Sequence, residues 1–138
     1  MQGLKLDQMT IGQSASFSKT ITETDVTLFA GISGDLNPVH IDETYAKDSM
    51  FKRRIAHGIL CAGLISAVLG MHLPGPGSIY LKQELKFKAP VYLGDTIKAI
   101  CTVKEKIEAK NIVVLDCSVV NQDGVVVIEG EATIKPPK

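Results

Sequence analysis

The sequence predicts an α+β fold in which an antiparallel sheet of about five strands surrounds one long apolar helix. Two observations lead to this expectation. The chain is mostly helical or irregular before the Pro-Gly-Pro-Gly segment at 74–77, and after it apolar and polar residues alternate as they do in strands. The length of 138 residues and the 45% of apolar residues suit a single domain over residues 1–138.

The first half of the chain predicts one strand followed by helices. Residues 15–21 alternate between two faces, which is typical of a strand. Thr22 is a suitable helix N-cap with Asp25 three residues later, so we expect a short amphipathic helix that ends near Gly34. A loop and a second short helix should follow. The run at 57–69 is apolar almost all round, which predicts a helix buried on every side.

The second half of the chain predicts four strands. Apolar and polar residues alternate over 78–87 and 96–107, which indicates two long strands with one face on the core. Strands at 111–120 and 125–134 are joined by Asn-Gln-Asp-Gly, which is typical of a hairpin turn. The simplest assembly is an antiparallel meander around the apolar helix. Such a sheet has two open edges, so we expect a homodimer.

The composition argues against several classes of protein. With 15 Lys and Arg against 15 Asp and Glu, a basic nucleic-acid binder is not expected. No stretch reaches the ~20 apolar residues of a membrane span, and the N-terminus lacks a signal-peptide pattern, so we expect an unprocessed protein without a membrane partner. The three cysteines have no C-x-x-C spacing, which favours core positions and a cytoplasmic location.

Familiar cofactor and metal motifs are missing from the sequence. It contains no G-x-G-x-x-G, no P-loop and no G-x-S-x-G. His40, His57 and His72 lack the H-x-x-x-H or H-E-x-x-H spacing, so we expect no metal. The basic run at 52–54 suits either the phosphates of a cofactor or a solvated loop, and the loop is the simpler interpretation.

The segment Asp35-Leu-Asn-Pro-Val-His40 is a candidate for acid–base chemistry. Asn37 suits a helix N-cap and Pro38 the first helical position, which places His40 in the first turn. This break in the chain lets the carboxylate of Asp35 and the imidazole of His40 aim at one point. A helix N-terminus also disfavours the imidazolium, so His40 should accept a proton near pH 7. The alternative is an ordinary capped turn with a solvated histidine.

A second candidate lies where the apolar helix begins, at Ala56-His57-Gly58. Free N–H groups at a helix N-terminus can stabilise a developing oxyanion. Glycine at position 58 would let a ligand approach the backbone closely. For His57 we expect a capping or packing role rather than catalysis.

Four separated motifs together resemble the MaoC-like (R)-specific enoyl-CoA hydratase family, of the type with a single hot-dog domain. The motifs are Asp35-Leu-Asn-Pro-Val-His-Ile-Asp42, Arg54-Ile-Ala-His-Gly-Ile-Leu60, Leu73-Pro-Gly-Pro-Gly-Ser-Ile-Tyr-Leu81 and Phe87-Lys-Ala-Pro-Val-Tyr-Leu-Gly-Asp95. The resemblance implies a hot-dog fold, dimerised with the active site at or near the interface. It also implies reversible addition of water to trans-2-enoyl-CoA, giving (R)-3-hydroxyacyl-CoA, with no cofactor besides the coenzyme A of the substrate.

The resemblance also implies roles for individual residues. Asp35 and His40 match the catalytic pair of the family, and Gly58 matches its backbone oxyanion donor. Asn37 lies within the motif and is implied to bind substrate and to shape the loop and its hydrogen bonds. Ser66 and Leu69, on the apolar helix, match positions that line the acyl pocket. Either member of the catalytic pair can deliver the proton to C2, because coupled groups titrate as a unit.

Three alternatives stay open at this point. A hot-dog acyl-CoA thioesterase would direct water at the carbonyl carbon, and a non-catalytic module would only bind the acyl thioester. The pairing of His40 with Asp35 favours hydration over the first, and the presence of all three catalytic groups argues against the second. A dehydratase acting on acyl-carrier-protein thioesters would use the same residues. Acyl chain length, pathway and direction are not fixed by the sequence.

Overall fold

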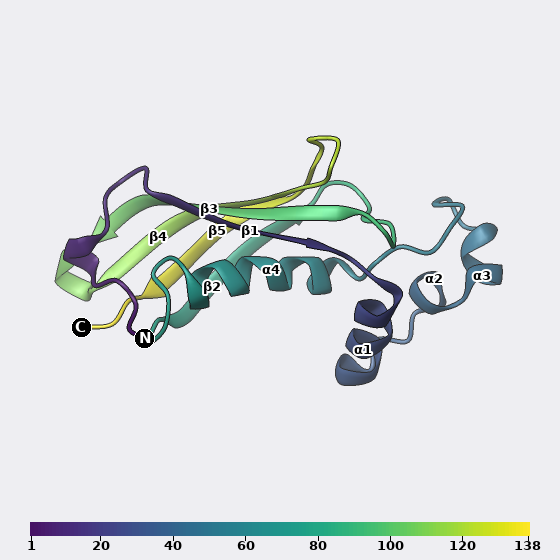
Figure 1. The fold of residues 1–138 in the computed structure, drawn as a ribbon, viewed down its shortest axis with the longest axis horizontal. Helices are drawn as coiled ribbons and strands as arrows, with labels where there is room; N and C mark the ends of the chain where they lie inside the picture. Colours follow the sequence, from purple (N-terminus) through teal and green to yellow (C-terminus); the bar gives the residue numbers. More distant parts are fainter.

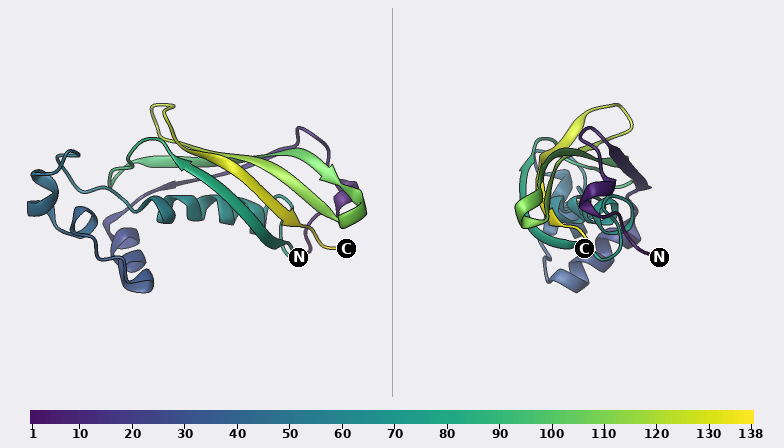
Figure 2. Two further views of the ribbon diagram at one scale, coloured as in Figure 1. Left: turned by 180° about the vertical axis from the view of Figure 1, so that it is seen from behind. Right: turned by 90° about the vertical axis from the view of Figure 1, so that its left-hand side faces the viewer.

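A computed structural model describes all 138 residues and shows an antiparallel five-stranded sheet curved around one long helix (Figure 1). The strands are β1 (Ser14–Thr20), β2 (Ile79–Phe87), β3 (Thr96–Ile107), β4 (Ile112–Val120) and β5 (Val126–Lys135). The α-helices are α1 (Glu23–Ser33), α2 (Pro38–Ile41), α3 (Glu43–Lys47) and α4 (Gly58–Met71), with short 3-10 turns at Leu6–Gln8 and Glu108–Lys110. Seen along its length, the sheet wraps α4 (Figure 2). The expected α+β class and hot-dog architecture are confirmed.

The order of the strands is β1-β3-β4-β5-β2, which differs from the expected meander. The meander is correct for β3, β4 and β5, and the β4–β5 turn has the predicted glycine at positive φ, Gly124 at 76°. It is wrong for β2, which pairs with β5 at the far edge of the sheet rather than with β3. Alternation of residue types reports which face of a strand is buried, but it does not report which strand lies beside it.

Local signals fix both ends of α1. The hydroxyl of Thr22 accepts from the N–H of Asp25 at 3.1 Å, and the Asp25 carboxylate accepts from the N–H of Thr22 at 2.9 Å. Gly34 ends the helix in the left-handed conformation, with φ at 80°. Both ends agree with the prediction, and they matter here because the chain emerges from Gly34 directly into Asp35.

The core lies between α4 and the three central strands. Alternate residues of β3 and β4 point into it, and they meet one face of α4. Its members include Ile97, Val103, Leu115, Val119, Ile65 and Val68, all of them 1% exposed or less. Each such side chain stabilises the fold by about 1.5–3 kcal/mol. The three cysteines are buried and free, as predicted.

The opposite face of α4 is uncovered in the single chain, which corrects the expectation of a helix buried on every side. Ile59 and Met71 are 59% and 55% exposed, and Gly63 and Ser66 are exposed between them. The edge strand β2 also leaves Phe87 half exposed. No helix combines the length and the apolarity needed to cross a bilayer. The uncovered apolar face of α4 suits contact with another protein surface.

Candidate active site

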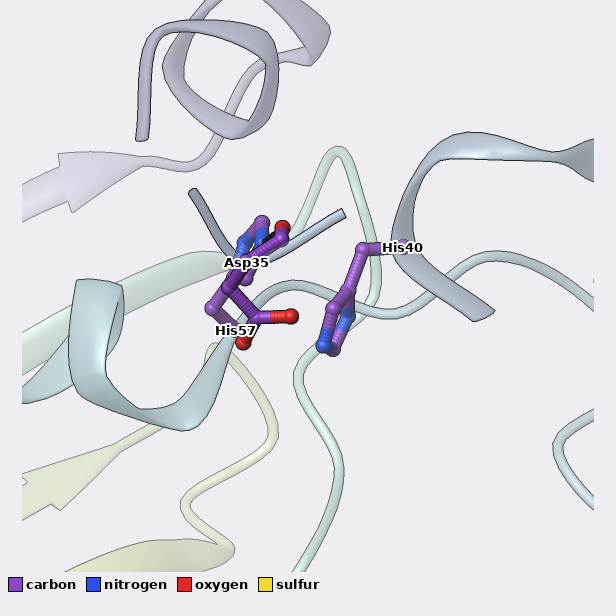
Figure 3. A group of neighbouring side chains, drawn as sticks. All are labelled: Asp35, His40 and His57. Atoms are coloured by element: carbon purple, nitrogen blue, oxygen red, sulfur yellow. Dashed lines mark hydrogen bonds between the residues drawn. The ribbon is translucent and has the colours of Figure 1, made fainter. Parts of the chain in front are cut away.

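Three polar side chains from separate segments meet beyond the N-terminal end of α4 (Figure 3). Asp35 follows α1, His40 belongs to α2, and His57 is the N-cap of α4. One ligand-type atom from each lies within 4.8 Å of the other two. The predicted convergence of Asp35 and His40 is therefore confirmed. His57 joins them although the spacing of the histidines gave no sign of it.

The Asn-Pro break positions the catalytic candidates as the sequence predicted. The side-chain oxygen of Asn37 accepts from the N–H of Val39 at 3.2 Å, which caps α2 with Pro38 in its first turn. The N–H of Asn37 donates to the carboxylate of Asp35 at 3.1 Å. Asn37 therefore shapes the turn between Asp35 and His40, and its predicted contact with substrate stays a prediction.

His40 is buried and held in one orientation. Its Nδ1 lies 2.7 Å from the carbonyl oxygen of Ile55. Because a carbonyl oxygen can only accept, Nδ1 carries the proton and Nε2 keeps a free lone pair. Burial lowers the pKa of the His40 imidazole below its ordinary value, against the opposing effect of the Ile55 hydrogen bond. The expected neutral ring is thus explained mainly by burial rather than by the helix N-terminus.

Arg54 ties this turn to α1. Its Nε donates to the carbonyl oxygen of His40 at 2.7 Å, and its guanidinium forms an ion pair with Glu23 at 2.7 Å. The side chain of Arg54 is only 12% exposed, so this residue does not belong to a solvated loop. Arg53 stacks on the ring of Tyr92 at 3.8 Å. Two of the three residues in the basic run are therefore engaged within the chain.

His57 has the expected packing role, but its meeting with Asp35 and His40 was not predicted from the sequence. It is 2% exposed, and its Nε2 lies 3.0 Å from the main-chain carbonyl oxygen of Asp35. Its ring packs on that of His40, with 3.9 Å between centroids and 31° between planes. The only hint in the sequence was a histidine directly before a free helix N-terminus, which also suits a simple cap. The structure shows no side-chain capping bond from His57.

Gly58 is the first residue of α4 and borders a cavity of about 530 Å³. As the first residue of the helix, it has an N–H without an intrahelical acceptor. A Cβ at this position would lie 2.6 Å from the ring of Phe87. A side chain at position 58 would therefore force the Phe87 ring or the start of α4 to shift, a reason for glycine that differs from the expected approach of a ligand.

The cavity is largely apolar, and His40 stands at its border. Its other lining residues include Phe51, Ile55, Ile59, Phe87 and Val91. Cys61 also lines it, and burial raises the pKa of this thiol to about 12. A thiol with such a pKa stays protonated near neutral pH, so Cys61 does not provide a thiolate nucleophile. The arrangement suits an apolar group bound beside an acid–base pair.

Ser66 and Leu69 do not border this cavity. Ser66 is exposed on the uncovered face of α4, and Leu69 is 2% exposed within the core. Ser66 lies eight residues after Gly58, which is about 12 Å along a helix. The single chain thus separates both residues from the catalytic candidates, and their place in an acyl pocket stays a prediction.

The cluster of Asp35, His40 and His57 also has the atom types of a metal site. His40 and His57 therefore meet in space although their spacing in the chain is not that of a metal motif. Stacked imidazole rings, however, direct their in-plane lone pairs side by side rather than toward one ion at 2.0–2.1 Å. The geometry suits an acid–base pair better than a metal centre.

Comparison with known proteins assigns the family. The model of the family described as "MaoC like domain" matches residues 7–124. This chain belongs to the MaoC-like family. It is 57% identical over 128 residues to a protein of Rhodospirillum rubrum named (R)-specific enoyl-CoA hydratase, covering 91% of this chain and 87% of that one.

Solved structures of MaoC-like hydratases have the same fold. The unliganded R-hydratase PhaJ1 of Pseudomonas aeruginosa superposes with a TM-score of 0.94 at 47% identity, over 99% of this chain and 88% of that one. The (R)-hydratase of Aeromonas caviae, described as involved in PHA biosynthesis, gives 0.91 at 43% identity over 94% and 98%. The predicted membership of this family is confirmed.

Proposed function

We propose that this protein is an (R)-specific enoyl-CoA hydratase that converts trans-2-enoyl-CoA reversibly to (R)-3-hydroxyacyl-CoA. The observation that carries the proposal is the meeting of Asp35 with His40, which lines an apolar cavity together with Gly58. The names of the similar proteins support this reaction class. A hydro-lyase of this kind needs a base that deprotonates water, an acid that protonates C2, and a hydrogen-bond donor to the thioester oxygen.

The Gly58 N–H supplies the oxyanion donor. Bound with its acyl chain in the cavity, the substrate would place its thioester oxygen at the start of α4. As water adds at C3, negative charge develops on that oxygen, and a fixed N–H dipole stabilises it. The surrounding apolar residues exclude water and so strengthen this interaction.

His40 and Asp35 move the protons. One water molecule, held between them, loses a proton to the free Nε2 of His40 while its oxygen bonds to C3. The Ile55 carbonyl, which accepts from Nδ1, stabilises the imidazolium that forms. The pair then returns one proton to C2 on the same face, so the addition is syn and no proton is gained or lost overall. This chemistry requires no cofactor besides the coenzyme A of the substrate.

We further propose a homodimer with the active site near the interface. Ile59 and Phe87 are 59% and 53% exposed, and both line the cavity. A second copy that covered the outer face of α4 would therefore also close the cavity. The three buried free thiols support a cytoplasmic location.

The test follows two signals from crotonyl-CoA: the absorbance of the enoyl thioester and the release of free thiol. Loss of the enoyl thioester absorbance without release of free thiol is expected of a hydratase. Thiol release without enoyl loss would instead assign a thioesterase, and neither change would assign a binding module. The same assay with an acyl-carrier-protein thioester then decides between the two carriers.

A further inference from the structure

We propose that His57 is a positioning residue for the hydration, which holds both Asp35 and His40 in the catalytic arrangement (Figure 3). This inference rests on the proposed function. His57 is 2% exposed, so it acts on the reaction through its neighbours rather than by contact with substrate.

The first observation is the hydrogen bond from His57 to the Asp35 segment. Nε2 lies 3.0 Å from the Asp35 carbonyl oxygen, and because that oxygen only accepts, Nε2 carries the proton. Every other hydrogen bond of residues 34–37 is local: Asp35 N–H donates to Ser33, and Asn37 N–H donates to the Asp35 carboxylate. His57 thus provides the one hydrogen bond that anchors this exposed turn to α4.

The second observation is the packing of the His57 ring. It lies against His40 at 3.9 Å between centroids and against Phe29 at 4.8 Å. The His40 ring is therefore held by its Nδ1 bond to Ile55 and by the face of His57. One buried side chain contacts both members of the acid–base pair, and its rotation would displace both.

The third observation is that Nδ1 of His57 is buried without a hydrogen-bond partner. An unpartnered buried nitrogen destabilises a fold. A phenylalanine would fill similar space between Phe29 and His40 without that penalty. A role in packing alone leaves this histidine unexplained, whereas a requirement for the Nε2–H bond to Asp35 explains it.

His57 also affects the pKa of His40. The groups that face His40 are the carboxylate of Asp35, the ring of His57 and the guanidinium of Arg54, which is bound to the His40 carbonyl. His57 adds to burial in lowering the pKa of His40, while Asp35 opposes this effect. This repulsion acts when the His57 ring carries a second proton, and it then opposes a positive charge on His40.

Three substitutions distinguish the effect of the His57 Nε2–H hydrogen bond from the effect of its aromatic ring. His57→Phe keeps an aromatic face without a donor, and we expect kcat for crotonyl-CoA to fall about tenfold to hundredfold with KM nearly unchanged. His57→Gln places an amide nitrogen near the position of Nε2, so it should restore most of the lost kcat. His57→Asn is the matched control: it is equally polar but shorter, and it should resemble His57→Phe. All three should move the acidic limb of kcat/KM to higher pH.

Folding of each variant is checked by circular dichroism and thermal melting. Wild-type kcat in a folded His57→Phe variant would overturn the proposal. Equal losses in folded Gln and Asn variants, with an unmoved acidic limb, would overturn it as well, because a purely structural role predicts that pattern.

A measurement on the unaltered protein covers the case in which the variants do not fold. Long-range ¹H–¹⁵N correlations report which ring nitrogen of each histidine carries the proton. The proposal expects Nε2–H on His57 and Nδ1–H on His40, and the opposite tautomer on His57 overturns it. This result does not depend on activity, so a protein that fails to hydrate crotonyl-CoA would contradict the proposed function separately.

Discussion

The Nδ1 atom of His40 lies 2.7 Å from the carbonyl oxygen of Ile55, fifteen residues further along the chain. This hydrogen bond fixes the tautomer of the imidazole and leaves Nε2 free. It also joins α2 to the segment that leads into α4, so the orientation of the His40 ring depends on the same segment that leads to Gly58.

The first prediction concerns the two proton-transfer groups. His40→Asn and Asp35→Asn should each reduce kcat for crotonyl-CoA by ~10²–10⁴-fold. The circular dichroism spectrum should not change. His72→Asn and Asp123→Asn are matched controls, because both residues are exposed and far from the site in sequence, and they should keep wild-type rates. Activity in either site variant close to that of its control would contradict the assignment.

The second prediction concerns the pH dependence of the rate. In the proposed mechanism the neutral form of His40 is the base, and burial lowers its pKa. Activity should therefore persist as the pH falls below about 6.5, the ordinary value for histidine, and should be lost only at a lower pH. The acidic limb of kcat/KM for the wild-type protein measures this, and a limb above 6.5 would show that another group controls the rate.

The same shift has a consequence for stability. A histidine whose pKa is lowered in the folded state binds fewer protons there than in the unfolded chain. Its contribution to the free energy of unfolding is complete above about 6.5 and is lost as the pH falls toward the folded value. Urea denaturation at several pH values should show this loss, and His40→Asn should weaken it.

The third prediction concerns Gly58. In Gly58→Ala the new methyl group would lie 2.6 Å from the Phe87 ring, so that ring or the start of α4 must move. We expect a destabilisation of about 1–3 kcal/mol and a lower kcat, because the proposed oxyanion donor, the N–H of residue 58, moves with the helix. Gly31→Ala is the control, since a Cβ there meets nothing within 4 Å, and it should stabilise α1 by about 0.5–1 kcal/mol. Equal behaviour of the two variants would contradict the packing argument.

The fourth prediction concerns the uncovered face of α4. We expect the wild-type protein to be a dimer in light scattering, and Gly63→Arg to shift it toward the monomer by placing a charge on that face. Activity should fall together with dimer content. Ile32→Arg is the control, because Ile32 is 83% exposed on α1, and it should remain dimeric. A monomeric and fully active wild-type protein would exclude an interface at the site.

The fifth prediction concerns metals. Because the His40 and His57 rings are stacked, we expect no functional ion between them and Asp35. Extended dialysis against EDTA should leave kcat and the melting temperature unchanged. A loss of activity that Zn²⁺ restores would show that the cluster is a metal site.

Sequence reasoning succeeded where the determinants are local. The Thr22 cap, the Gly34 end of α1 and the turn at Gly124 each depend on a few neighbouring residues. Strand faces were also predictable, because alternation records burial. The position of β2 was not, since edge strands pair through backbone groups that any residue provides. The open face of α4 was missed because an apolar helix has the same pattern whether its own chain or another surface covers it.

In the site, too, local features were predictable from the sequence and contacts between distant segments were not. Asp35 and His40 lie within six residues around an Asn-Pro break, so their convergence could be inferred from the sequence. The contact of His57 with both residues depends on how α1, α2 and α4 pack, which no spacing in the chain reveals. The reason for glycine at position 58 was hidden similarly, because Phe87 reaches it from the far edge of the sheet.

Because β2 pairs with β5, the wall of the cavity that β2 provides can be completed only after the last strand has been synthesised. Phe87, at the end of β2, forms one wall of the cavity, and β2 is held in the sheet by residues of β5, the last strand. During synthesis, the acid–base pair and the start of α4 therefore emerge long before the wall beside them can be secured. A nascent chain stalled before Val126 would contain Asp35, His40 and Gly58 but not the strand that pairs with β2 and so secures Phe87 in the sheet.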